Sequence, residues 1–178
     1  MEQALDTFPR RLLHQAAVRP RRPATREKDL GIWQTWSWAD VADEVRALAC
    51  GLASIGFRRG DHLAIIGDNR PRLYWAMVAA QCVGGVPVPM YQDAPANEFV
   101  YVLNDAGCET MFCGAEFVPL IEAVKAQCPK LKHIIAIDGG HKSWPAYDAW
   151  RDSQSDKDPH LKITADDDAI QLYTSGTT

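Results

Sequence analysis

The sequence predicts an α/β fold, a mostly parallel sheet with helices on both faces. Between residues 62 and 137, four short apolar runs of strand length alternate with segments whose apolar residues recur at three- and four-residue steps, the helical period. Strands separated by helices pair in parallel through right-handed crossovers, and the helices then cover both faces of the sheet. A hydrophobic content of 47% and a charged content of 24% are ordinary for a globular chain. The predicted strands are His62–Ile66, Val86–Met90, Thr110–Cys113 and His133–Ile137.

A short amphipathic helix is predicted before the sheet. Thr7 is a suitable cap, Pro9 stands in the first turn, and Pro20 ends the helix. The segment from this helix to residue 28 is the most basic part of the chain, with seven arginines and lysines. It has no interleaved aromatic residues that would stack on bases, so we interpret it as a solvated connector rather than a nucleic-acid or anionic-membrane patch. The predicted apolar face of the helix is Phe8, Leu12, Leu13, Ala16 and Ala17.

A β-hairpin is expected next, with strands at residues 24–28 and 32–36 around the turn Asp29-Leu30-Gly31. Trp33 and Trp36 would point to opposite faces of one strand, so we expect packing roles for them rather than one shared ligand pocket.

The helix that follows the hairpin has clear signals at both ends. Ser37 and Asp40 resemble a capping box, and Gly56 is suited to the left-handed residue that ends a helix. Its apolar residues are Val41, Val45, Leu48, Leu52 and Ile55.

Three further helices are expected between the strands: one beginning at Pro71, one at about 95–104 and one at about 116–127. The prolines of Val86-Pro87-Val88-Pro89 remove two backbone donors, so we expect that strand at an edge of the sheet. The predicted apolar faces are Leu73, Tyr74, Met77, Val78 and Ala80 in the first helix, Phe99, Val102 and Leu103 in the second, and Phe117, Leu120, Ile121 and Val124 in the third.

The pattern weakens after Gly140. Ser143 is a candidate cap for a short helix with Trp144, Tyr147 and Trp150, and the polar residues 152–159 are linker-like. The chain therefore divides into an α/β subdomain at 1–151, with its helix and hairpin, a linker-like segment at 152–168, and a final part at 169–178. That part is predicted to be a short buried strand, Ala169–Tyr173, and the beginning of a phosphate-binding loop.

Composition and motifs exclude several classes of function. The net charge of −4 argues against nucleic acid, and no apolar run approaches a membrane span or an early secretory signal, so we predict a cytoplasmic protein. The five cysteines form no C-x-x-C pair and are interpreted as reduced packing residues. No phosphate-loop or dinucleotide fingerprint, catalytic triad or metal-ligand spacing of the histidines is present. The acidic run Asp166–Asp168 suits Mg²⁺, but we interpret it as a charged turn.

The end of the chain carries the strongest functional signal. Residues 172–178 (Leu-Tyr-Thr-Ser-Gly-Thr-Thr) place hydroxyls and free N–H groups directly after an apolar run, which suits phosphate. The segment resembles the start of the signature of the AMP-forming adenylate synthetases, which continues Gly-x-Pro-Lys-Gly. Thr35–Asp40, Gly51–Ile65 and Gly84–Pro89 resemble other segments of that family, and Pro89–Tyr91 with Tyr101–Gly107 is most similar to its long-chain fatty acyl-CoA synthetase branch.

The resemblance implies that this is the amino-terminal part of a long-chain fatty-acid–CoA ligase, inactive alone, with ATP, Mg²⁺ and CoA as its substrates or cofactors. In members of this family the carboxylate of the substrate acid attacks the α-phosphate of ATP, and the resulting acyl-AMP passes its acyl group to CoA. No catalytic residue or metal ligand is assignable to this chain. Peripheral membrane contact is compatible with this function, and a homo-oligomer or self-associating fragment is expected. The implied donors to the β- and γ-phosphates are Thr174, Ser175, Thr177 and Thr178, with Gly176 allowing close backbone approach.

Two alternatives remain open. One is a non-catalytic α/β binding or scaffold module, and the other is a different adenylate-forming enzyme, such as an aryl-CoA ligase or an adenylation domain.

Overall fold

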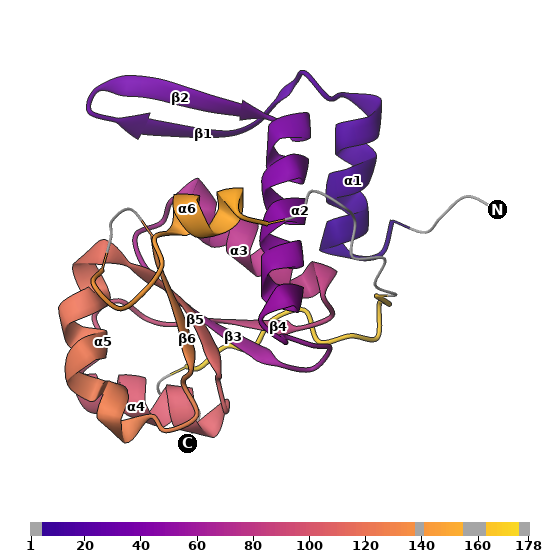
Figure 1. The fold of residues 1–178 in the computed structure, drawn as a ribbon. Coiled ribbons are helices and arrows are strands. Elements are labelled where there is room, and N and C mark those ends of the chain that lie inside the picture. The colour runs from indigo at the N-terminus through magenta and orange to yellow at the C-terminus, as the bar shows by residue number, and fades with distance from the viewer. Residues whose placement is uncertain (1–4, 138–140, 155–162, 175–178) are drawn as a thin grey trace.

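Four parallel strands form the centre of the structure, a computed structural model that describes residues 5–137, 141–154 and 163–174. Their spatial order is β4-β3-β5-β6, with helices on both faces of the sheet (Figure 1). The predicted α/β class and all four predicted strands are confirmed. The strands are β3 (His62–Ile66), β4 (Val86–Pro89), β5 (Thr110–Gly114) and β6 (His133–Ile137).

The two faces of the sheet support two separate cores. Alternate side chains of a strand point to opposite faces, and β3 divides accordingly: Leu63 and Ile65 join one core, Ala64 and Ile66 the other. The first core is covered by α1 (Phe8–Val18), α2 (Trp38–Ser54), α3 (Pro71–Cys82) and α6 (Tyr147–Asp152), the second by α4 (Ala96–Asp105) and α5 (Val118–Val124). None of the helices within the described ranges is both long and apolar enough to cross a membrane.

The caps predicted for α1 and α2 are present. Thr7 Oγ1 accepts a hydrogen bond from the Arg10 amide at 3.3 Å. Ser37 and Asp40 form both bonds of a capping box, at 3.3 Å from the Asp40 amide and 2.8 Å from the Ser37 amide. Gly56 follows the end of α2 with φ of +90°, the left-handed conformation that glycine adopts without a Cβ penalty.

The predicted apolar faces of two helices are partly wrong. In α1, Leu12 is buried, but Phe8 is 61% exposed, because the helix packs against α2 along a narrow stripe. In α3, Tyr74 is 51% exposed and Trp75 is buried instead. The neighbours of α3 decide this. Trp75 meets Trp36 of the hairpin, which comprises β1 (Pro23–Asp29) and β2 (Ile32–Ser37), in an edge-to-face contact at 5.2 Å. This contact leaves Tyr74 on the exposed side of the helix, where its hydroxyl donates to Asn69 Oδ1.

Two predicted helix boundaries also need correction. The helix expected at 116–127 is α-helical only over Val118–Val124, with 3₁₀ turns at Ala115–Phe117 and Lys125–Gln127. Pro119 explains the late start, since proline has no N–H and fits only the first helical turn. Ser143 does not cap α6, because Ala136 pairs with Ala146 in a β-bridge and the helix begins only after it.

Strand β4 lies at the edge of the sheet, as its prolines predict. The Val86 and Met90 amides donate to the Asp61 and Ile65 carbonyls on the β3 side, at 2.8 and 2.9 Å. Pro87 and Pro89 occupy the alternate positions, which face the outer edge. That edge can therefore accept hydrogen bonds at these two residues but cannot donate them, which limits further strand pairing.

The predicted packing role of the cysteines fits the cores. Cys108, Cys113 and Cys128 are buried, and no disulfide joins cysteines of the described chain. Burial raises the pKa of the Cys108 and Cys113 thiols to about 12. Both therefore stay protonated at neutral pH and are poor nucleophiles.

Candidate functional site

Among the predicted phosphate-binding residues, the structure describes Thr174, which is exposed and directly follows Tyr173. Ser175, Gly176, Thr177 and Thr178 lie outside the described residues. The site is therefore defined by the segment that leads to Thr174, residues 163–174, which we call the C-terminal strap.

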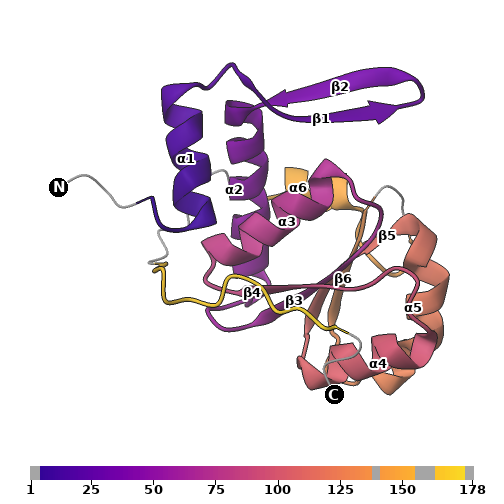
Figure 2. The same cartoon turned by 180° about the vertical axis from the view of Figure 1, so that it is seen from behind.

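The strap runs beside the outer edge of β4 (Figure 2). The Gln171 amide donates to the Pro87 carbonyl at 3.0 Å, so the acceptor-only edge is met by a donor from the strap. The predicted buried strand at 169–173 is nevertheless wrong: the segment is extended without regular strand pairing, and Ile170 and Leu172 are 44% and 62% exposed. The reason is the edge itself, since Pro89 offers no amide to continue the ladder.

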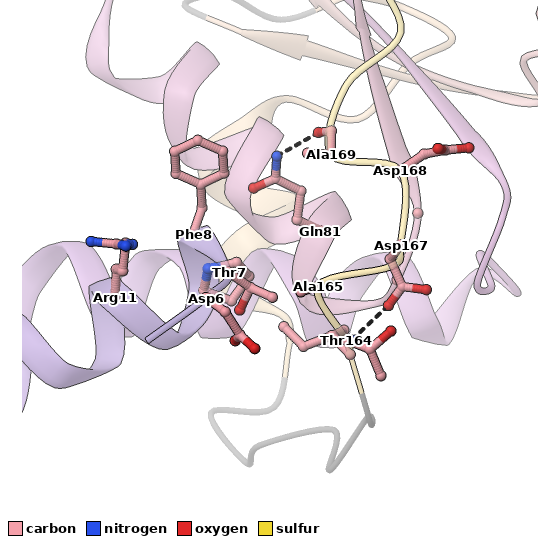
Figure 3. A pocket seen from close by; sticks show the side chains of 14 residues that line it. Asp6, Thr7, Phe8, Arg11, Gln81, Thr164, Ala165, Asp167, Asp168 and Ala169 are labelled. Carbon is pink, nitrogen blue, oxygen red and sulfur yellow. Dashed lines mark hydrogen bonds between the residues drawn. The ribbon is translucent and has the colours of Figure 1, made fainter. Parts of the chain in front are cut away.

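Polar contacts hold the beginning of the strap against the body. The run Asp166–Asp168 forms the charged turn that the sequence predicts, in which the Asp167 carboxylate accepts from the Thr164 amide at 2.8 Å (Figure 3). The same carboxylate pairs with Arg59. Arg10 donates to the Ile163 carbonyl at 2.8 Å. The described residues contain no cluster of three or more His, Cys, Asp or Glu arranged to hold a metal.

A glutamine of α3 holds the middle of the strap. Gln81 Nε2 donates to the Ala169 carbonyl at 2.6 Å (Figure 3). A cavity of about 120 Å³ lies between the strap, α1 and the end of α3, and Figure 3 shows its lining. Its wall includes Gly84 and Gly85, which precede β4. The cavity is therefore at the opposite end of β4 from Thr174.

Tyr173 anchors the end of the strap, a role that the sequence did not reveal. Its hydroxyl donates to Asp105 Oδ2 at 2.7 Å and accepts from Gln171 Nε2 at 2.7 Å. Its ring meets Tyr101 edge-to-face at 6.2 Å. Partial burial, together with the hydrogen bond to Asp105, raises the pKa of Tyr173, which keeps the hydroxyl protonated as a donor. The available signal was an aromatic residue with a polar tip immediately before the loop.

These contacts fix where the loop begins. The strap passes Gln81 and Gly84 first, then Pro87, and then Pro89 and Met90 beside Tyr173, so it runs in the same direction as β4. The strap therefore ends, at Thr174, beside the carboxyl end of the parallel strands. Open α/β sheets bind their ligands at this end. An exposed hydroxyl followed by a Ser-Gly-Thr-Thr sequence at this place suits the binding of phosphate oxygens.

The single backbone bond to β4 gives a direct test of this arrangement. Gln171→Pro removes the backbone amide that donates to Pro87 together with the side-chain amide that donates to the Tyr173 hydroxyl, and Gln171→Ala removes the side-chain amide alone. We expect hydrogen–deuterium exchange over residues 169–174 to be about fivefold faster in the proline variant than in the alanine variant, for the loss of ~1 kcal/mol. Leu172→Pro is the matched control, because alternate amides of an extended segment point away from β4. Equal exchange in the two proline variants would show that the bond does not hold the strap.

Comparison with known proteins relates this arrangement to a family. The model of the AMP-binding enzyme family, described as "AMP-binding enzyme", matches residues 12–178. The uncharacterized protein Rv1549 of Mycobacterium tuberculosis is 37% identical over 106 residues, which cover 60% of this chain and 59% of that protein. The long-chain-fatty-acid–CoA ligase FadD15 of Mycobacterium bovis is 30% identical over 158 residues, covering 83% of this chain and 26% of the ligase.

A solved structure shows the same fold. The inhibitor-bound N-terminal domain of FACL13 from Mycobacterium tuberculosis superposes with a TM-score of 0.85 at 24% identity, covering 96% of this chain and 42% of that one. The chain thus spans 59% of the length of Rv1549 and 26% of the length of FadD15. The family match includes the strap and the residues that follow Tyr173. This chain belongs to the AMP-binding enzyme family.

Proposed function

We propose that this chain is the amino-terminal part of an AMP-forming acyl-CoA synthetase that activates a long-chain fatty acid with ATP and transfers it to CoA. The observation that carries the proposal is the strap, which runs along β4 and brings Thr174 to the carboxyl end of the sheet. The relative FadD15, a long-chain-fatty-acid–CoA ligase, supports the substrate class. The product would enter lipid metabolism in the cytoplasm.

The proposed chemistry begins with a carboxylate that is a poor acyl donor. It attacks the α-phosphorus of ATP, the bond to the bridging oxygen of pyrophosphate breaks, and acyl-AMP forms. The CoA thiolate then attacks the acyl carbon and AMP leaves. Charge grows on the phosphates in the first step, so the catalyst needs donors that are already in position. The β- and γ-phosphates would accept hydrogen bonds from Thr174, Ser175, Thr177 and Thr178. Gly176, which has no side chain, would let the backbone approach the phosphates closely.

The anchors of the strap support this role. The Arg59–Asp167 ion pair and the Tyr173–Asp105 hydrogen bond hold both ends of the segment before the loop, so the position of Thr174 is set before ATP binds. Of the proposed phosphate donors the structure describes Thr174, and the described residues provide no cluster of His, Cys, Asp or Glu that would hold Mg²⁺. In this proposal Mg²⁺ would bind as a complex with the phosphates of ATP and neutralise part of their charge.

We also propose the division of the chain into an α/β subdomain at 1–151, a linker-like segment at 152–168 and a final part at 169–178 that carries the strap end and the loop. The adenine, acyl and CoA pockets would lie outside these residues, and residues 1–178 alone would not catalyse the reaction.

Pyrophosphate exchange tests the proposal. The chain is expressed with its native continuation and given ATP, Mg²⁺ and carboxylic acids of increasing length. Acid-dependent exchange into ATP is expected, strongest with long chains, while residues 1–178 alone show none. Absence of exchange with every acid would refute the proposal. Mass spectrometry of the products with CoA or with acyl carrier protein then identifies the acceptor, which matters because ScoC of Streptomyces coeruleorubidus, 30% identical over 146 residues, is a fatty acid–[acyl-carrier-protein] ligase.

A non-catalytic binding module is the second candidate. Equilibrium dialysis of the 178-residue chain with ATP separates the candidates. Binding of ATP by this chain alone would favour the binding module, and no binding would favour the synthetase fragment.

We expect the 178-residue chain to associate with itself. Ile170 and Leu172 of the strap and Tyr91 after β4 expose apolar surface, and clustered apolar surface favours association. Multi-angle light scattering at rising concentration should show species larger than a monomer. A strictly monomeric profile would contradict the expectation.

A further inference from the structure

The cavity beside the strap has the size and lining of a site for one small ring. Its volume is about 120 Å³, and it lies between the beginning of α1, the end of α3 and the strap (Figure 3). Apolar cavities of roughly 150 Å³ hold a benzene molecule. The apolar part of the wall consists of Phe8, Pro9, Gly84, Gly85, Ile163, Ala165 and Ala169.

The charged groups around the cavity are matched in sign. Asp6 and Asp167 are each paired with an arginine, so neither carboxylate is left to attract a cation. The two other charged residues of the wall are Asp168 and Arg11, one of each sign, and both are exposed. Figure 3 shows them on opposite sides of the cavity. A neutral ligand therefore suits the cavity better than an ion does.

Gln81 brings an unpaired acceptor to the wall of the cavity. Its Nε2 donates to the Ala169 carbonyl at 2.6 Å, and since a carbonyl only accepts, this bond fixes the orientation of the side-chain amide. Its Oε1 is turned toward α1 (Figure 3), where it is buried and accepts no hydrogen bond from the described residues. A buried acceptor without a donor is unfavourable, so a molecule that donates one hydrogen bond would complete this site.

Phe8 controls access to the oxygen of Gln81. Figure 3 shows its ring on the side of the cavity to which Oε1 is turned. The side chain of Phe8 is 61% exposed, and exposed side chains exchange rotamers within nanoseconds. An outward rotation of the ring would open Oε1 to the cavity without a change in the backbone. A ligand can therefore reach an oxygen that is covered while the cavity is empty.

We propose that this cavity binds a small neutral molecule that has one ring and one hydroxyl or N–H donor, such as a phenol. The ring would lie against the apolar wall, and the donor would bond to Gln81 Oε1. Hydrogen bonds that share one amide polarise it and strengthen each other, so the ligand would also tighten the bond from Nε2 to Ala169. The site would thus stabilise the strap. The inference does not depend on the proposed ligase activity, because its test measures binding and amide exchange alone.

Phenol and toluene are matched probes for this site, since a hydroxyl group and a methyl group have similar sizes. Titration of the ¹⁵N-labelled 178-residue chain, followed by amide chemical shifts, should give a dissociation constant of about 1 mM for phenol. Toluene should bind about tenfold more weakly, because it leaves the acceptor unpaired. The shifts should centre on Gln81, Ala165 and Ala169, and hydrogen exchange of the strap should slow when phenol is saturating.

Gln81→Met tests the contact itself, because methionine keeps the length of the side chain and removes the amide. Phenol and toluene should bind this variant about equally. Gln92→Met is the matched control, since Gln92 also donates through Nε2 to a backbone carbonyl, that of Gly67, but is exposed at the other end of β4. It should keep the preference for phenol.

Three results would overturn the proposal. The first is the absence of shifts at 20 mM phenol, which would mean that water alone satisfies Gln81. The second is equal binding of phenol and toluene by the unsubstituted chain. The third is a preference for phenol that persists in Gln81→Met, which would place the hydroxyl elsewhere. Unchanged exchange of the strap with phenol bound would overturn the stabilising role.

Discussion

Thr174→Val is expected to lower acid-dependent pyrophosphate exchange about 100-fold in the protein that carries this chain with its native continuation. The strap fixes Thr174 at the carboxyl end of the sheet through the Tyr173–Asp105 hydrogen bond at 2.7 Å. A donor held in position on a phosphoryl group that gains charge contributes on the order of 10²–10³ in rate when it is removed. Initial rates across ATP concentrations would show whether the loss lies in kcat, as transition-state binding requires.

Thr174→Ser serves as the control, because it keeps the hydroxyl and loses only the methyl group. We expect it to retain activity within a few-fold of the unsubstituted enzyme. If valine and serine variants were equally active, the Thr174 hydroxyl would have no part in phosphate binding and the loop would act through its backbone alone.

Phe112→Ala is expected to destabilise the chain by about 3–5 kcal/mol, the usual cost of removing a buried aromatic ring from a core. Phe112 lies in β5 and is fully buried. Its ring meets Tyr147 at 6.1 Å and Trp150 at 5.7 Å, both edge-to-face, so one side chain joins the sheet to α6. Urea unfolding followed by circular dichroism gives the free energy of unfolding.

Tyr91→Ala provides the comparison, since Tyr91 is an aromatic residue of similar size that is 68% exposed. Its replacement should change the free energy of unfolding by no more than about 0.5 kcal/mol. A similar loss in both variants would mean that the first core does not depend on the contacts of Phe112 with α6.

Local sequence signals predicted the parts of the fold that depend on neighbouring residues. The capping box at Ser37 and Asp40, the glycine after α2 and the edge position of β4 are all confirmed. In each case the signal is a backbone property: a side chain that satisfies an amide, a missing Cβ or a missing N–H. Such properties act within a few residues and can be read before any tertiary contact is known.

The choice of helix face was less predictable. Tyr74 and Trp75 are adjacent in α3, and the sequence favoured the tyrosine as the buried residue, whereas Trp75 is buried against Trp36. Which of two neighbouring apolar residues is buried depends on the surface that packs against the helix. That surface comes from the hairpin, 39 positions earlier in the chain than Trp75.

The sequence by itself determined the sheet and its edge strand, and it predicted a phosphate loop at 174–178 from its residue types. Only the tertiary structure decided that Ile170 and Leu172 lie exposed beside the edge strand and that Tyr173 anchors this segment to Asp105. It also decided that Arg26 and Lys28 share a face of the hairpin with Trp33. The physical reason is the distance along the chain over which each kind of interaction acts. Caps, prolines and glycines act on the backbone nearby, whereas burial, charge pairing and the grouping of side chains depend on which distant segments the fold brings together.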